Sequence, residues 1–187
     1  TRLREELTRQ SAAPGAGAAV EILALCDDGT AALGAKRNQL MDMARGRFLV
    51  FVDDDDRLSP DYVRIILAAI RENPLADCIS HAGEITFCGR HPRKLVHSTG
   101  YRDWYECKGE YVRPPCHITP IRSEIARRYR FAEVYYSEDM DWALRISRDG
   151  ALRQEVLLDT VLYYYDSRRH YTWQWLLDKT QPARHAL

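Results

Sequence analysis

Long apolar runs are missing from this chain of 187 residues. No apolar stretch approaches the roughly 18 residues that a membrane-spanning helix needs, so the sequence predicts no membrane span. An excess of charge is also missing, because 27 basic residues balance 27 acidic ones. Proteins that bind nucleic acid over a broad face usually carry a basic excess. We therefore expect no nucleic-acid partner and look for the ligand at local sites.

Paired cysteines are missing too. The five cysteines are odd in number and widely spaced, without a C-x-x-C pair, which indicates a reducing compartment rather than a disulfide framework. No secretory signal is visible, although the chain begins at Thr1 without a Met. We expect a cytoplasmic protein, at most peripheral to a membrane. A zinc site at Cys78, His81, Cys88 and His91 is an alternative, but its spacing departs from the usual two close pairs of ligands.

The most informative stretch runs from Gly46 to Tyr62. An apolar run from Phe48 to Val52 meets four acids, Asp53 to Asp56, and Ser59-Pro60 follows as a helix start. This order predicts a buried strand, an acidic turn and a helix. Inward-facing carboxylates at the end of such a strand suit Mg²⁺ or Mn²⁺ completed by phosphate oxygens. The alternative is an acidic surface turn whose carboxylates repel one another toward water.

A second strand that ends in acids precedes this one. Val20 to Leu25 has the composition of a strand and leads into Asp27-Asp28-Gly29. A helix is predicted from Gly34 to about Ala44, with Lys36 and Arg37 near its start. These cations can reach a phosphate or a base, or they form a solvated basic turn.

A third group of acids opens a later helix. Ser137 is the expected N-cap, which places Glu138 and Asp139 in the first turn, where the helix dipole favours carboxylates. A carboxylate at such a helix start, partly shielded by aromatic side chains, is a candidate general base. Asp141 and Arg145 are four residues apart and predict a surface ion pair.

The remaining predicted elements say less about function. The segment Arg168-Arg169-His170 could neutralise a diphosphate, complete the metal shell or form a solvated basic turn. Residues 81 to 115 look irregular, with short β-like pieces between glycines. The other expected elements are helices over Leu3 to Gln10, over Pro60 to Asn73, after Ser123 and over Thr172 to Lys179, and strands over Ala76 to Ser80, Leu152 to Leu158 and Val161 to Tyr165.

The order of these motifs resembles the GT-A glycosyltransferases of family 2. The likeness covers about residues 20 to 64 and 114 to 147. It implies an α/β fold, a Rossmann-like GT-A domain whose mixed, mainly parallel sheet is flanked by helices. The family's first strand is not visible, and we expect it to be missing from this chain. A single domain over 1–187 is implied, with a nucleotide-sugar-binding half at about 1–80 and an acceptor-binding half at about 81–187.

The resemblance also implies roles for particular residues. Asp55 resembles the main metal ligand, with Asp53 beside it, and the expected cation is Mn²⁺ or Mg²⁺. Asp53 or Asp54 would contact the ribose or the metal. By the same likeness the donor is a nucleotide sugar, with UDP expected. Its base would lie near Asp27 or Asp28, and Arg37 would lie near the base or the diphosphate.

Asp139 resembles the base that deprotonates the acceptor hydroxyl, in an inverting single displacement. The acceptor, whether a glycan, a lipid or another hydroxyl compound, is not encoded in any motif. Two alternatives stay open. One is a non-catalytic nucleotide-sugar or glycan-binding domain of the same fold. The other is a nucleotidyltransferase, which would normally show a Gly-rich phosphate loop that this sequence lacks.

Overall fold

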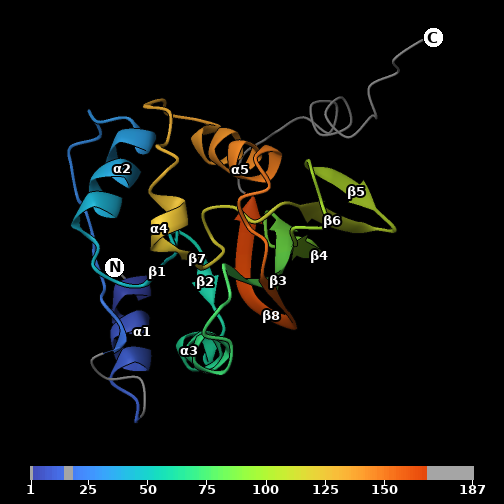
Figure 1. Ribbon diagram of the computed structural model, residues 1–187, viewed down its shortest axis with the longest axis horizontal. Coiled ribbons are helices and arrows are strands. Elements are labelled where there is room, and N and C mark those ends of the chain that lie inside the picture. The colour runs from blue at the N-terminus through green and yellow to red at the C-terminus, as the bar shows by residue number, and fades with distance from the viewer. Residues whose placement is uncertain (1, 15–18, 168–187) are drawn as a thin grey trace.

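The computed structural model describes residues 2–14 and 19–167 (Figure 1). The predictions for Arg168, Arg169, His170 and the helix from Thr172 to Lys179 lie outside these residues. The described helices are α1 (Arg2–Ser11), α2 (Leu33–Met43), α3 (Tyr62–Glu72), α4 (Ser123–Ala126) and α5 (Glu138–Arg148). The described strands are β1 (Phe48–Leu49), β2 (Arg57–Leu58), β3 (Cys78–Phe87), β4 (Arg90–His97), β5 (Tyr105–Cys107), β6 (Glu110–Arg113), β7 (Ile121–Arg122) and β8 (Glu155–Ser167).

The strands form one mixed sheet with helices packed around it, which confirms the α/β prediction. Its order is β1-β7-β3-β4-β6-β5, and β8 pairs with β3 and β2. The balance of strand directions differs from the expected, mainly parallel sheet. Within the described residues only the pairs β3–β8 and β4–β6 are parallel. The hairpins that follow β3 account for much of this difference, because hairpin-connected strands are antiparallel.

The predicted strand from Val20 to Leu25 is absent, although the helix after it is present as α2. Residues 19–23 instead line an apolar cavity of about 410 Å³ together with residues 46–48, Val50, Val52 and α3. Residues 20 to 25 take part in no strand pairing among the described residues, and β1 pairs with β7.

Residues 81 to 115 are more regular than the sequence suggests. β3 and β4 form a hairpin whose turn residues, Cys88 and Gly89, both have positive φ. Lys108 and Gly109 do the same between β5 and β6. Two consecutive positive φ values define the turn that best matches the twist of antiparallel strands, and Gly adopts it without strain.

The two strands expected near the C-terminal end are one strand, β8. The pairing of β3 with β8 passes from His81–Leu158 directly to Ala82–Val161. Asp159 and Thr160 are therefore accommodated as an irregularity inside the strand, which is how an antiparallel or parallel ladder absorbs extra residues.

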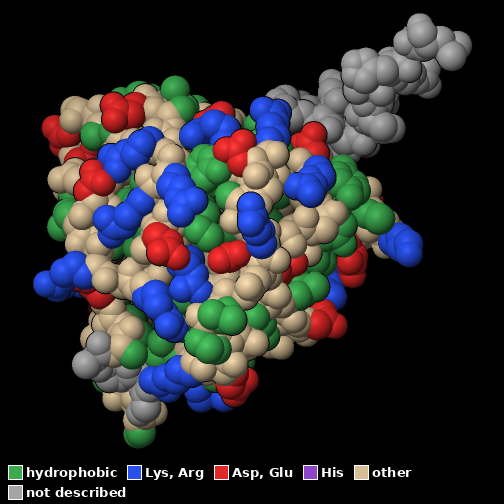
Figure 2. All heavy atoms as spheres, viewed as in Figure 1, with side chains coloured by type: hydrophobic (Ala, Val, Ile, Leu, Met, Phe, Trp, Pro, Cys, Tyr) green, Lys and Arg blue, Asp and Glu red, His purple; other side chains and the backbone are tan. Residues whose placement is uncertain are grey.

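The core lies between the sheet and the helices. α3 contributes Val63 and Ile66, as its periodicity predicts, and α5 contributes Trp142 and Ile146; all four are buried. In Figure 1, α2 and α5 lie at one end of the molecule and α1 and α3 at the other. Positive and negative side chains are interspersed on the face seen in Figure 2. None of the helices in the described part of the chain combines the length and apolarity needed to cross a bilayer.

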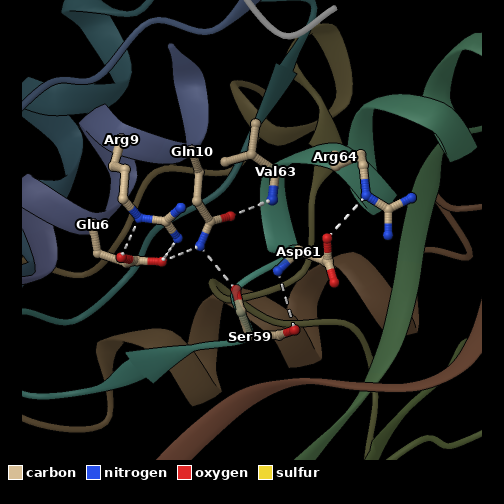
Figure 3. A network of polar contacts seen from close by, with 7 residues as sticks. All are labelled: Glu6, Arg9, Gln10, Ser59, Asp61, Val63 and Arg64. Atoms are coloured by element: carbon tan, nitrogen blue, oxygen red, sulfur yellow. Dashed lines mark hydrogen bonds and ion pairs between the residues drawn. The ribbon is translucent and has the colours of Figure 1, made fainter. Parts of the chain in front are cut away.

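A buried glutamine joins α1 to α3 (Figure 3). The Gln10 side-chain amide donates to the Ser59 carbonyl at 2.8 Å, and its oxygen accepts from the Val63 backbone N–H at 2.9 Å. Val63 is in the first turn of α3, where backbone N–H groups have no partner within the helix. Gln10 therefore caps α3 from another helix and fixes the chain just after the acidic turn.

Gln10→Ala is expected to lower the free energy of unfolding by about 1–3 kcal/mol, because it leaves the buried Val63 N–H without a partner. Urea unfolding followed by circular dichroism measures this change. The control is Arg9→Ala on the same helix, whose ion pair with Glu6 is exposed on the arginine side. An equal loss in both variants would contradict the capping role.

Candidate functional site

The four acids after β1 form a reverse turn that separates them into two pairs. The Asp56 backbone N–H donates to the Asp53 carbonyl at 3.2 Å, which closes the turn. Asp56 is buried and Asp53 partly buried, whereas Asp54 and Asp55 are exposed. The first and last acids thus face the protein, and the middle two face solvent.

Asp56 is held by a tyrosine from β8. The Tyr163 hydroxyl donates to Asp56 Oδ2 at 2.5 Å and accepts from the Asp53 backbone N–H at 3.3 Å. Burial raises the pKa of Asp56 to about 7; the hydrogen bond from Tyr163 opposes this rise, and the charges of Asp53 and Asp55 add to it. Asp56 therefore carries a proton part of the time near neutral pH.

Helix α2 is fixed against the segment that leads to α5. The Asn38 amide donates to the Phe131 carbonyl at 3.0 Å, and its oxygen accepts from the Phe131 N–H at 2.9 Å, both in the core. A Cβ on Gly34 would lie 1.8 Å from the Ala132 carbonyl oxygen, so this close approach needs glycine. Phe131 in turn stacks on Trp142 of α5, with ring centroids 4.8 Å apart.

Arg37 is buried between two carboxylates rather than lying in a solvated basic turn. Its side chain is 4% exposed. Its Nη2 donates to Asp53 Oδ1 at 2.8 Å, and its Nε lies 3.5 Å from Glu138 Oε1. The guanidinium also lies over the rings of Phe51 and Phe131. Its Nη1 is buried without a hydrogen-bond partner among the described residues.

His117 connects the acidic turn to α5. Its Nε2 lies 3.2 Å from Asp53 Oδ2, and its Nδ1 lies 3.1 Å from Asp139 Oδ2. The residue is 7% exposed. The sequence analysis assigned no role to His117, which lies in the proline-rich segment from Pro114 to Pro120. The available signal was a histidine enclosed by prolines between the two acidic motifs.

The charges in this cluster change one another's protonation. Burial and the charge of Arg37 act to lower the pKa of His117, but Asp53 and Asp139 outweigh them and raise it well above its ordinary value. Burial acts to raise the pKa of Asp139, but His117, followed by Arg37 and Arg113, holds it well below its usual range. Asp139 is therefore ionised at neutral pH and able to accept a proton.

Glu138 and Asp139 lie side by side at the start of α5 but in different surroundings. Glu138 is buried, and that burial raises its pKa despite the charge of Arg37. The Asp139 side chain keeps 26% of its surface exposed. Of the two acids only Asp139 is both ionised and accessible. The expected surface pair of Asp141 and Arg145 is present at 2.9 Å.

Asp27 and Asp28 lie in the exposed loop before α2. Asp27 pairs with Lys36 at 3.0 Å and accepts from the Ala31 N–H, and Asp28 accepts from the Thr30 hydroxyl. The pKa of each is lowered, by Lys36 for Asp27 and by Thr30 for Asp28. Both carboxylates shape this loop and remain open to solvent.

A metal site was predicted in two places. Within residues 2–14 and 19–167, no group of three or more His, Cys, Asp or Glu side chains is arranged to hold a metal ion. The zinc alternative therefore has no assembled site: Cys78 and His81 are buried in β3, whereas Cys88 and His91 are exposed. Mg²⁺ commonly uses only one or two carboxylates together with substrate phosphates, which Asp55 and Asp53 can still provide.

Comparisons with known proteins identify the family and the fold. A family model described as glycosyl transferase family 2 matches residues 27–130. The structure of S. aureus TarS 1-349 in complex with UDP-GlcNAc is 18% identical, with a TM-score of 0.57, and the match covers 79% of this chain and 42% of that one. The complex with UDP is 19% identical, with a TM-score of 0.53 and coverages of 72% and 40%. No curated protein matches significantly.

At this identity the likeness to TarS shows the fold alone, and this chain spans about two fifths of the length of those chains.

Asp56→Asn is expected to stabilise the metal-free protein above pH 7. The pKa of Asp56 is about 7 when folded and about 3.9 when unfolded. Its stabilising contribution is therefore complete below about pH 4 and is lost as the pH rises toward 7. Asparagine can still accept from Tyr163 and has no charge to bury, so its advantage should grow to the order of a few kcal/mol above pH 7.

Urea unfolding in EDTA at about pH 5 and about pH 8 measures this difference. Asp54→Asn changes an exposed neighbour in the same turn and serves as the control. An advantage of Asp56→Asn that is the same at both pH values would contradict the assignment.

Proposed function

The chain belongs to glycosyl transferase family 2, and on that basis we propose that it transfers a sugar from a nucleotide-sugar donor, UDP-sugar, to an acceptor hydroxyl with inversion at the anomeric carbon. One observation carries the proposal. His117 touches both Asp53 of the acidic turn and Asp139 of α5, so the donor-side acids and the candidate base share one cluster. Acids on opposite sides of the molecule could not serve one reaction.

The donor end of the site is assigned to Arg37 and the two loops beside it. The buried Nη1 of Arg37 offers an unused donor, and a guanidinium suits phosphate oxygens. Asp27 and Asp28 would contact the nucleoside, and Asp53 or Asp54 the ribose. The TarS complexes with UDP and UDP-GlcNAc support UDP as the nucleotide. In this assignment residues 1–80 bind mainly the donor and residues 81–187 mainly the acceptor.

Asp55 and Asp53 would hold a divalent cation, Mn²⁺ or Mg²⁺. Asp55 is exposed at the tip of the turn, and the Asp53 side chain keeps 37% of its surface exposed. Both residues would bind the cation through carboxylate oxygens, which are the ligands that hard divalent cations prefer. When bound, such a cation stabilises negative charge on a departing diphosphate.

The transfer is a single displacement. Asp139 takes the proton from the acceptor hydroxyl as the hydroxyl oxygen forms a bond to the anomeric carbon. The bond between that carbon and the diphosphate oxygen breaks, and its electron pair leaves with the nucleoside diphosphate. Arg37 donates to the diphosphate as charge develops there. Because Asp139 has a low pKa, it is a weak base and is most effective when attack and proton transfer occur together.

Asp139→Asn is expected to lower kcat for UDP release from UDP-GlcNAc by about 10² to 10⁴-fold, because the amide cannot accept the proton. UDP affinity measured by calorimetry should stay close to that of the wild type. Asp141→Asn, two residues along the same helix and paired with Arg145, is the matched control and should keep its rate. A fully active Asp139→Asn would refute the base assignment, and a wild type that binds UDP without turnover would favour a binding domain.

Asp55→Ala is expected to abolish the part of UDP binding that depends on Mn²⁺. Thermal shift with UDP, with and without Mn²⁺, measures this part, since ligand binding raises apparent stability with occupancy. Asp61→Ala removes another exposed acid near the same turn and should leave the shift intact. If Asp55→Ala retains the full Mn²⁺-dependent shift, the cation does not use Asp55.

A further inference from the structure

We propose that His117 is a positioning residue for the transfer reaction: its imidazole holds one oxygen of Asp53 and one oxygen of Asp139, and thereby sets the base against the donor end of the site. This inference rests on the proposed function. It adds a residue that neither the sequence pattern nor the family likeness had assigned.

The His117 imidazole lies between the carboxylates of Asp53 and Asp139. The Nε2 and Nδ1 atoms lie 3.2 Å and 3.1 Å from carboxylate oxygens on opposite sides of the ring. Nε2 makes a hydrogen bond with Asp53, whereas Nδ1 lies within ion-pair distance of Asp139 without a hydrogen bond. The buried ring therefore lies between the two carboxylates and fixes how far apart they are held.

The two oxygens of the Asp139 carboxylate have different surroundings. Asp139 Oδ2 is the oxygen nearest to His117, and no side-chain hydrogen bond to Asp139 Oδ1 is found among the described residues. The side chain is also partly exposed. Holding one oxygen therefore leaves the other to receive the acceptor proton, in an orientation that the protein fixes before the acceptor arrives.

Backbone hydrogen bonds fix the position of His117 itself. The Phe51 backbone N–H donates to the His117 carbonyl at 2.8 Å, two residues before Asp53. The Thr119 N–H donates to the Cys116 carbonyl at 2.9 Å, which closes a turn around His117. All residues from Pro114 to Pro120 are buried. The imidazole is thus tied to the same backbone segment that presents Asp53.

Comparison with two other buried histidines separates this role from ordinary core packing. His81 contacts the carbonyl oxygens of Ala82 and Ile118, which is a structural arrangement. His97 has no hydrogen-bond partner for either ring nitrogen within the described residues. Among these three histidines, His117 alone contacts carboxylates of the site. Without its cation, Asp53 and Asp139 would repel each other across the space it leaves.

The test compares His117→Ala with the wild type in UDP release from UDP-GlcNAc with Mn²⁺. We expect kcat to fall about 100-fold, the cost of a misplaced catalytic group, with little change in the KM for UDP-GlcNAc or in UDP affinity. Imidazole added to the assay should restore part of kcat by occupying the space that the ring leaves. It should not rescue Asp139→Asn. His97→Ala removes a buried imidazole outside the site and should keep kcat even if its melting temperature falls.

A second variant keeps the test decisive if His117→Ala does not fold. His117→Gln retains one amide donor for one of the two carboxylates and should bind UDP while kcat falls. An active wild type with an unchanged kcat in either folded His117 variant would overturn the inference alone. Loss of kcat in His117→Ala without any imidazole rescue, accompanied by an equal loss in His97→Ala, would also overturn it. A wild type that releases no UDP would overturn the proposed function and this inference with it.

Discussion

Two carboxylates that face one buried imidazole are the arrangement on which the rest of the site depends. Removing a charge from water costs several kcal/mol unless an opposite charge and hydrogen bonds compensate it. Here His117 compensates Asp53 and Asp139, and Arg37 compensates Asp53 and Glu138. Each cation serves two acids, so loss of either cation leaves two acids exposed to mutual repulsion. The cluster is consequently ordered by its own charges, before any ligand binds.

Core packing sets the distance between the parts that carry these charges. Arg37 is on α2 and Asp139 is on α5, and the two helices are joined through Asn38, Phe131 and the stacked ring of Trp142. These contacts are buried, and because protein interiors are close-packed they hold the two helices at a fixed separation. On the other side of the acidic turn, Gln10 ties α1 to the start of α3. The acidic loop therefore lies between two anchored helices.

The sequence was sufficient to predict the elements that depend on neighbouring residues alone. Apolar residues predicted α1, α2 and α3, and the acids predicted a turn after β1 and, with Ser137, the start of α5. It was not sufficient where pairing decides the outcome. Residues 20 to 25 have the composition of a strand, yet they pair with no strand among the described residues. The contacts of His117 were not predicted, because its partner Asp53 lies 64 residues earlier. The turn at Cys88-Gly89 had a readable signal, a Gly in a two-residue connection.

The division of the four acids has a consequence for a negatively charged donor. Four ionised carboxylates in one turn would repel a nucleoside diphosphate, yet the folded turn carries less charge than its sequence suggests. Asp56 shares a hydrogen bond with Tyr163 and is partly protonated near neutral pH, and Asp53 is compensated by Arg37 and His117. The uncompensated charge is thereby concentrated on Asp54 and Asp55, the exposed pair. In the proposed site a cation held by Asp55 and Asp53 would offset part of this charge, while Arg37 and His117 keep Asp53 oriented.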